Sequence, residues 1–169
     1  SLKEVVGNTA ILAALRAWLK RPPGERGHTL LFYGPAGCGK TTLARIAARS
    51  VGARDLSIDE INASDNRKIE DVRRIIQEMV MPPLDGSPRA VILDEAHELT
   101  PQAQDALLKA LEDVPQHQYF MLCSTDPEKL KRTIRSRCIQ FQVMTLSKQE
   151  IADLVIGMAG RFNIKLAED

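Results

Sequence analysis

Aromatic residues, cysteines and net charge are all scarce in this sequence of 169 residues. Phe, Trp and Tyr make up 4% of it, which argues against a surface on which nucleic-acid bases stack. The three cysteines are widely spaced and form neither a disulfide framework nor a Cys-x-x-Cys zinc pair, so we expect no zinc and a reducing compartment, the cytoplasm or a eukaryotic nucleus. The net charge of +1 gives no sign of a nucleic-acid-binding protein. No apolar run reaches the roughly 20 residues of a membrane-spanning helix, and we therefore expect no membrane partner.

What the sequence does contain is the composition and periodicity of one globular domain, with 44% hydrophobic and 27% charged residues. Short apolar runs alternate with stretches of helical periodicity. The predicted strands cover residues 29–33, 56–61, 89–93, 119–124 and 139–143. The predicted helices run from Asn8 as N-cap to before Pro22, over 41–51, 69–80 and 101–113, and onward from a capping box at 147–150. This alternation predicts an α/β fold, a mostly parallel five-stranded sheet with helices on both faces.

The most specific motif is a glycine-rich segment between the first predicted strand and the second predicted helix. It reads Gly-Pro-Ala-Gly-Cys-Gly-Lys-Thr over residues 34–41 and fits the phosphate-loop pattern G-x-x-x-x-G-K-[ST] in full. Backbone N–H groups of such a loop, and the amino end of the helix after it, bind phosphate oxygens. Lys40 is expected to reach the β- and γ-phosphates, and the Thr41 hydroxyl to ligate Mg²⁺. The residues predicted to bind the phosphates are Gly34, Pro35, Ala36, Gly37, Cys38, Gly39, Lys40, Thr41 and Thr42.

A pair of carboxylates ends the third predicted strand, about fifty residues after the phosphate loop. Asp94 is expected to hold the Mg²⁺ sphere opposite Thr41, and Glu95 to orient and polarise the attacking water. His97 follows two residues later, but no second His or Cys stands at metal-ligand spacing from it. We therefore predict that His97 is a surface or loop-packing residue. The phosphate loop and the carboxylate pair together predict a Mg²⁺-dependent P-loop nucleoside triphosphatase.

The order of these motifs resembles that of an AAA+ ATPase, and more narrowly that of a DNA sliding-clamp loader. The segments that carry this resemblance are residues 5–8 (Val-Val-Gly-Asn), 61–65 (Ile-Asn-Ala-Ser-Asp), 107–112 (Leu-Leu-Lys-Ala-Leu-Glu), 125–130 (Thr-Asp-Pro-Glu-Lys-Leu) and 136–138 (Ser-Arg-Cys). The first looks like the family's N-terminal box, with Asn where Gln is usual. The second is similar to the small subunits of replication factor C, and the third and fourth look like the bacterial polymerase III loader. The last matches the motif that both branches share.

The resemblance implies an ATPase that opens a ring-shaped sliding clamp and loads it onto primer–template DNA in replication. Its implied partners are other loader subunits, the clamp and the DNA backbone, and its implied cofactors are ATP and Mg²⁺. Val5 and Val6 would pack near the adenine, and Thr125 resembles the polar sensor beside the γ-phosphate. Arg137 resembles the arginine finger, which reaches the nucleotide of a neighbouring subunit. The implied catalytic residues are thus Lys40, Glu95, Thr125 and Arg137. The implied DNA contacts are Arg67, Lys68, Ile69 and Arg73, with Gln102 and Gln104 as second candidates.

The chain departs from the family pattern in two ways. It lacks the four-cysteine zinc module of the bacterial loader, which favours a replication-factor-C-like, archaeal, phage or divergent bacterial protein. Only the first helix of the family's lid follows the ATPase part, so we divide the chain into a nucleotide-binding domain, residues 1–145, and the beginning of a truncated helical lid, residues 146–169. Two alternatives stay open: another AAA+ replication or repair ATPase, such as a helicase loader or branch-migration motor, and a non-catalytic loader stator.

Overall fold

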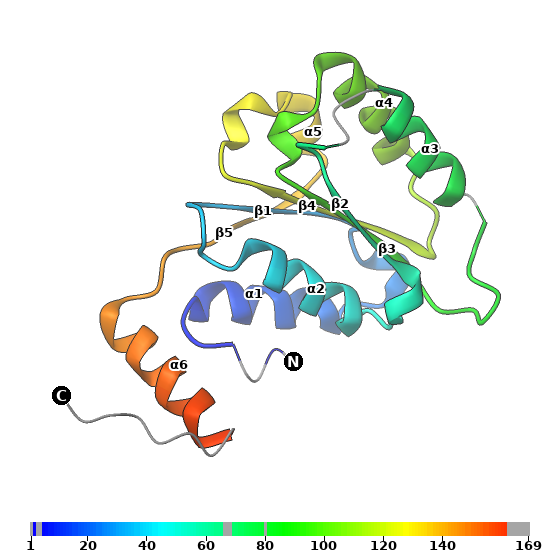
Figure 1. The fold of residues 1–169 in the computed structure, drawn as a ribbon. Coiled ribbons are helices and arrows are strands. Elements are labelled where there is room, and N and C mark those ends of the chain that lie inside the picture. Colours follow the sequence, from blue (N-terminus) through cyan, green and yellow to red (C-terminus); the bar gives the residue numbers. More distant parts are fainter. Residues whose placement is uncertain (1, 3–4, 66–68, 80, 162–169) are drawn as a thin grey trace.

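One sheet of five parallel strands forms the centre of the protein (Figure 1). The structure is a computed structural model that describes residues 2, 5–65, 69–79 and 81–161. In sheet order the strands are β2 (Ile58–Asn62), β3 (Arg89–Asp94), β4 (Gln118–Ser124), β1 (Thr29–Tyr33) and β5 (Ile139–Gln142). Every neighbouring pair is parallel. The predicted α/β fold with a parallel five-stranded sheet is confirmed.

Helices cover both faces of this sheet, as the alternating pattern predicted (Figure 1). α1 (Thr9–Lys20) and α2 (Lys40–Ser50) lie on one face, and α3 (Ile69–Met79), α4 (Pro101–Glu112) and the short α5 (Arg132–Ser136) lie on the other. All seven residues of β4 are buried, because this strand has a neighbour on each side and helices on both faces.

Alternation along β4 separates the core into two halves. Tyr119, Met121 and Cys123 join the cluster under α1 and α2, whereas Phe120 and Leu122 join the cluster under α3 and α4. The register aligns the carboxyl ends of β3, β4 and β1, with Leu93 opposite Leu122 and Tyr33 opposite Ser124. Ligands of open parallel sheets bind beyond such carboxyl ends, and the phosphate loop and both carboxylates emerge there.

The second strand begins later than predicted. Leu56 does not lie in a strand but in a 3₁₀ turn, η2 (Asp55–Ser57), and is fully exposed. The turn is closed by a hydrogen bond from the Ser57 amide to the Arg54 carbonyl at 2.7 Å, and β2 begins at Ile58. The apolar alternation of Leu56 with Ile58 therefore came from a turn followed by a strand. Helix α5 was not predicted, because five residues are too few to show helical periodicity.

Asn8 occupies the N-cap position of α1 but does not cap it. Its backbone is left-handed (φ 49°) and its side chain makes no capping hydrogen bond. The side-chain amide instead donates to the Met144 carbonyl (3.0 Å) and accepts from the Met144 amide (2.8 Å). Asn8 thus joins the start of α1 to the segment after β5, so the prediction of an N-cap is wrong in its chemistry.

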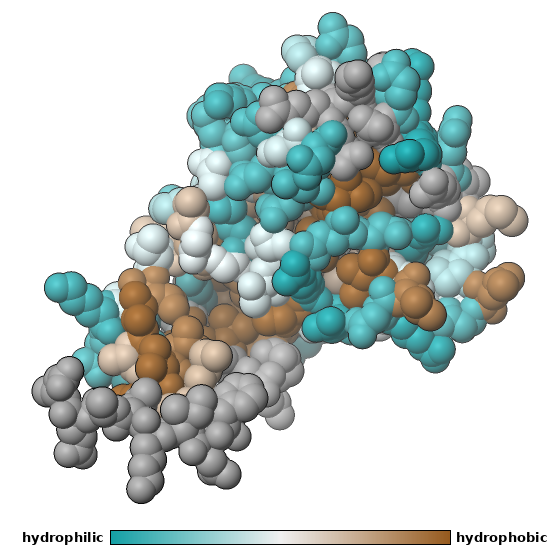
Figure 2. Space-filling model, viewed as in Figure 1, coloured by the Kyte–Doolittle hydropathy of each residue, from teal (hydrophilic) through white to brown (hydrophobic). Residues whose placement is uncertain are grey.

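The last helix, α6 (Lys148–Arg161), begins with the predicted capping box. The Ser147 amide donates to Glu150 Oε2 at 2.7 Å, and the Glu150 amide donates to Ser147 Oγ at 3.2 Å. Hydrogen bonds from the backbone and the side chain of Ser147 lower the pKa of the Glu150 carboxyl. The helix stands away from the sheet, and Figure 2 shows apolar side chains exposed over it. These include Ile151, Val155, Ile156 and Met158. The division at residue 145 stays a prediction. No helix in the described part of the chain is long and apolar enough to cross a bilayer.

Candidate nucleotide-binding site

The phosphate loop follows β1 directly and turns into α2 at Lys40. Its first glycine lies against β5: a Cβ at Gly34 would be 2.0 Å from the carbonyl oxygen of Val143. Its last glycine, Gly39, is the N-cap of α2 with φ 93°, a backbone conformation that side chains rarely adopt. The spacing of glycines in the motif thus has a local physical cause at both ends of the loop.

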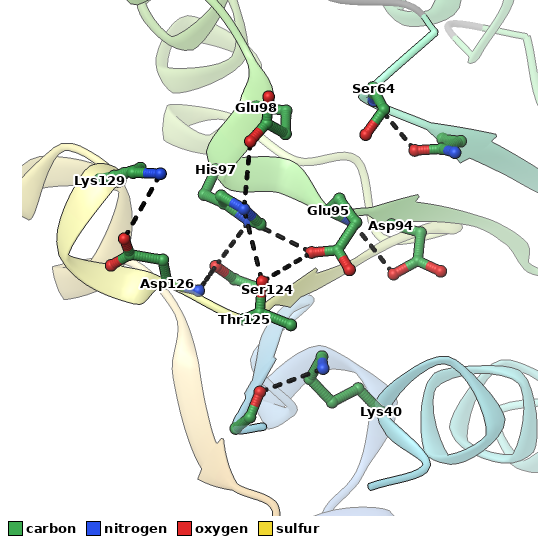
Figure 3. Close-up of polar contacts among 12 residues, drawn as sticks. Lys40, Ser64, Asp94, Glu95, His97, Glu98, Ser124, Thr125, Asp126 and Lys129 are labelled. Carbon is green, nitrogen blue, oxygen red and sulfur yellow. Dashed lines mark hydrogen bonds and ion pairs between the residues drawn. The ribbon is translucent and has the colours of Figure 1, made fainter. Parts of the chain in front are cut away.

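Lys40 is folded back over this loop (Figure 3). Its Nζ donates to the carbonyl oxygens of Gly34 (3.1 Å) and Pro35 (2.9 Å), and the residue is 6% exposed. Because these partners are weak neutral acceptors, phosphate oxygens can replace them with stronger charge-assisted bonds. The ammonium group is therefore held at the loop, where the motif predicts that it reaches a bound triphosphate.

Thr41 and Asp94 meet although they lie 53 residues apart in the chain. Thr41 Oγ1, on the first turn of α2, donates to Asp94 Oδ2 at 2.8 Å, and the other carboxylate oxygen accepts from the Glu95 amide at 3.0 Å. Hydroxyl and carboxylate oxygens are the hard ligands that Mg²⁺ prefers. The two residues that the sequence predicted for the metal are thus brought together, and their donor set fits this ion.

A cleft of about 380 Å³ lies beside these groups. The residues that line it are Ala36, Gly37, Gly39, Lys40, Thr41, Thr42, Asp94 and Glu95. Among the residues that the structure describes, no three or more His, Cys, Asp or Glu side chains form a metal-binding group. A cation in this cleft would therefore depend on Thr41, Asp94 and phosphate oxygens, as a Mg²⁺–nucleotide site does.

Glu95 and Thr125 are also neighbours, on the ends of adjacent strands (Figure 3). Thr125 Oγ1 donates to Glu95 Oε2 at 3.1 Å. The Glu95 backbone is left-handed (φ 48°), an uncommon conformation for a residue other than glycine, and it turns the chain from β3 into η3 (Ala96–Glu98). The residue predicted to polarise water and the residue resembling the phosphate sensor therefore lie at one place.

Sequence reasoning missed the surroundings of His97. Its side chain is only 8% exposed and lies among Ser124, Thr125, Glu95 and Glu98 (Figure 3). The interpretation as a packing residue therefore understated its polar contacts. The missed signal was the pair of hydroxyl residues that follows the apolar run of β4, since parallel neighbouring strands bring their carboxyl ends together.

Arg137 does not belong to this cleft. It follows α5, where its guanidinium donates to Glu112 Oε1 at 3.0 Å and to the Thr133 carbonyl at 3.2 Å. The side chain is 37% exposed. Its neighbour Cys138 donates its thiol to the Ile134 carbonyl at 3.1 Å, and burial raises the pKa of that thiol to about 12. Cys138 therefore packs the short helix as a protonated thiol, beside an arginine that is open to solvent.

The remaining predicted contacts differ in outcome. Arg67 and Lys68 lie outside the described residues, as does the side chain of Ile69. Arg73 is exposed and lines a groove between α3 and α4 together with Gln102. Val5 and Val6 are half-buried before α1, and their predicted place near the adenine stays a prediction.

Gln104 is not available for DNA in this structure. It is 4% exposed, its amide donates to the carbonyls of Leu99 and Lys129 at 3.2 Å each, and its oxygen accepts from the Lys131 amide at 2.8 Å. Naming Gln104 as a second DNA candidate was wrong, because its polar atoms join α4 to the segment before α5.

Comparison with known proteins identifies the family of this chain. The model of a family described as DNA polymerase III, delta subunit, matches residues 53–147, more than half of the chain. The chain belongs to this family of AAA+ clamp-loader proteins. The match includes β3 with both carboxylates and the Ser-Arg-Cys segment. The predicted membership of the clamp-loader family is confirmed.

Two bacterial relatives support this membership. The chain is 33% identical to DNA polymerase III subunit gamma of Buchnera aphidicola over 172 residues, which cover 89% of this chain and 47% of that protein. It is 34% identical to DNA polymerase III subunit tau of Escherichia coli over 169 residues, covering 88% of this chain and 26% of that protein. This clamp-loader chain therefore spans about half and about a quarter of these two relatives.

A solved structure shows the same fold. The RuvB Holliday junction branch migration motor of Thermotoga maritima superimposes with a TM-score of 0.81 at 25% identity, covering 99% of this clamp-loader chain and 55% of that chain. At this identity we take from it the architecture of an AAA+ P-loop domain and nothing of the motor's activity.

Proposed function

We propose that this protein is an ATP-hydrolysing subunit of a replicative clamp loader. The observation that carries the proposal is the meeting of Lys40, the Thr41–Asp94 pair and Glu95 at one cleft, with Thr125 bonded to Glu95. These groups come from α2 and from the ends of β3 and β4, so the sheet itself holds them in register. A non-catalytic stator needs none of this arrangement.

ATP binding would exchange the backbone partners of Lys40 for the β- and γ-phosphates. Thr41 and Asp94 would hold Mg²⁺, which supplies positive charge to neutralise the phosphate oxygens. Glu95 would take a proton from the attacking water while the oxygen of that water bonds to the γ-phosphorus. The bond from that phosphorus to the β–γ bridging oxygen then breaks, leaving ADP and inorganic phosphate. Thr125 would orient the γ-phosphate and the water through its hydroxyl.

Arg137 would act on the nucleotide of the neighbouring subunit. Three observations support this role. Arg137 is exposed, it does not line the nucleotide cleft of its own subunit, and it belongs to the Ser-Arg-Cys motif. A guanidinium placed at the transferring phosphoryl group typically changes turnover by about 10³- to 10⁵-fold. ATP binding would thereby depend on one subunit and hydrolysis on two, which links turnover to assembly around a clamp and primer–template DNA.

Subunit mixing tests this proposal. Full-length chains carrying Lys40→Ala retain Arg137 but have a defective phosphate loop. Chains carrying Arg137→Ala retain an intact phosphate loop but lose the arginine. Each assembly alone should be nearly inactive. A random 1:1 co-assembly should recover roughly a quarter of the wild-type ATPase activity. In about a quarter of adjacent subunit pairs, an intact phosphate loop on one subunit faces an intact Arg137 on the other.

The wild-type assembly should also hydrolyse ATP faster with a ring clamp and primer–template DNA than with junction DNA. Co-assemblies as inactive as their parents would contradict the action of Arg137 between subunits. A wild-type assembly that binds ATP but ignores the clamp would contradict the clamp-loader function.

A further inference from the structure

His97 lies beyond the carboxyl ends of β3 and β4, the paired strands that Glu95 and Thr125 follow. It belongs to η3, the single turn after β3, and its side chain is 8% exposed although that of Glu95 is 34% exposed. Ser124, which it faces, is completely buried. The imidazole is thus enclosed at the inner side of the proposed catalytic pair (Figure 3).

Four side-chain oxygens surround the two ring nitrogens. Nδ1 lies 3.3 Å from Ser124 Oγ and 3.3 Å from Glu95 Oε2. Nε2 lies 3.4 Å from Thr125 Oγ1 and 3.4 Å from Glu98 Oε1. Because Thr125 also donates to Glu95, the three side chains of Glu95, Thr125 and His97 form a closed ring of polar contacts.

The hydrogens in this ring can be assigned by counting. The Thr125 hydroxyl has one hydrogen, which points to Glu95, so toward His97 it can only accept from Nε2. Ser124 Oγ accepts from the Asp126 amide at 3.1 Å and, together with Glu95 Oε2, faces Nδ1. The imidazole therefore carries a proton on Nε2. By donating to Thr125, it directs the threonine's hydrogen toward the carboxylate.

We propose that His97 is a positioning residue for ATP hydrolysis, whose ring holds Glu95 and Thr125 in their relative orientation. This inference rests on the proposed function. Glu95 needs such support, because its left-handed backbone is intrinsically unfavourable and its side chain extends to the cleft. Misplacing a reacting group by about 1 Å costs on the order of 10²-fold in rate. His97 does not line the cleft, so its loss should affect turnover and leave ATP binding intact.

Two substitutions at His97 separate positioning from packing. His97→Phe keeps a planar ring but removes both nitrogens, whereas His97→Gln keeps one donor and one acceptor. In the full-length assembly, His97→Phe should lower kcat by about 10- to 100-fold, with the Kd for ATP within about twofold of wild type. His97→Gln should recover kcat to within about fivefold of wild type. His117→Phe, at the amino end of β4 and remote from the cleft, is the matched control and should leave kcat unchanged.

A double substitution tests whether His97 works through Thr125. If it does, Thr125→Val by itself should lower kcat nearly as much as His97→Phe does. Adding His97→Phe to Thr125→Val should then lower kcat further by no more than about threefold. Multiplied effects, or a kcat for His97→Phe that is unchanged or raised, would overturn the proposal. Should phenylalanine at position 97 prevent folding, judged by Tm, His97→Ala carries the same expectation.

A wild-type assembly without ATPase activity would overturn the proposed function itself, whereas an active assembly indifferent to His97 would overturn only this inference.

Discussion

The carboxyl edge of the sheet and the corner after α5 hold the predicted catalytic residues in very different ways. At the sheet edge, Lys40 is buried and Thr41, Asp94, Glu95 and Thr125 are joined by hydrogen bonds of 2.8 to 3.1 Å. At the α5 corner, Arg137 is 37% exposed and paired with a carboxylate of Glu112 that is 51% exposed. The groups at the sheet edge bond to one another within one subunit, whereas the Arg137 guanidinium at the α5 corner is exposed to solvent.

Under the proposed function, this difference separates the groups that one subunit holds alone from the group that would complete a neighbour's site. Buried and mutually bonded groups are held in place before ligand arrives, which favours tight and specific nucleotide binding. An exposed ion pair contributes only about 0.2–1 kcal/mol and is easily exchanged for another partner. Under the proposed function, a nucleotide phosphate of a neighbouring subunit would therefore replace Glu112 as the partner of Arg137 at little cost in free energy. Four substitutions test this contrast and are given in order of decreasing effect.

Arg137→Ala separates the two regions most strongly. We expect kcat of the full-length assembly to fall by about 10³-fold or more, because the transferring phosphoryl group loses its stabilising cation. The Kd for ATP, measured by equilibrium titration, should change by less than about threefold. Arg132→Ala, which removes an exposed arginine from α5, the short helix that Arg137 follows, is the matched control. Equal losses in both variants would mean that general charge at α5, and not Arg137, matters.

Glu95→Gln tests the sheet edge while keeping a side-chain oxygen that can accept the hydrogen bond from Thr125. The amide cannot accept a proton from water, so we expect kcat to fall by about 10²- to 10³-fold while ATP still binds. Stopped-flow measurement of phosphate release would detect the change, and Tm should stay near that of wild type. Normal turnover in this variant would assign the role of base to another group.

Lys40→Ala should weaken binding at the sheet edge. Losing charge-assisted bonds of about 1.5–3 kcal/mol corresponds to roughly 10- to 100-fold weaker ATP binding. Fluorescence titration with a labelled nucleotide measures this directly. A Kd close to that of wild type would show that the ammonium remains with the carbonyls of Gly34 and Pro35 when nucleotide binds.

Glu112→Gln addresses the resting partner of Arg137. Because that ion pair is exposed, releasing the guanidinium should raise kcat by at most about threefold, with a smaller difference at high salt. Stability should change by less than about 1 kcal/mol, measured by denaturant titration. A large gain in kcat would mean that the contact with Glu112 restrains the arginine far more than its exposure suggests.

Some of this site was predictable because its information is local. The phosphate loop needs glycine at 34, against the Val143 carbonyl, and at 39, where φ is positive, so its sequence records its backbone. The apolar run of β3 followed by two carboxylates likewise indicates a buried strand that ends at the surface. Gln104 and His97 were misjudged because each also has a partner far along the chain, Lys129 at 25 residues and Ser124 at 27 residues. The family resemblance implied a DNA contact for Gln104, and the lack of a second metal ligand favoured a surface or loop-packing role for His97. The polar atoms of both are bonded inside the protein.

The order of the strands and of the helices other than α5, the phosphate loop and the groups predicted to bind a nucleotide could all be read from the sequence. These properties depend on periodicity and backbone preference within short segments. Which of the groups meet depends on the tertiary fold. The order β2-β3-β4-β1-β5 brings the ends of β3 and β4 together and so joins Glu95, His97 and Thr125. It also leaves Arg137 at an exposed corner. The physical reason is that strand pairing and burial, which act between residues far apart in the chain, set these distances.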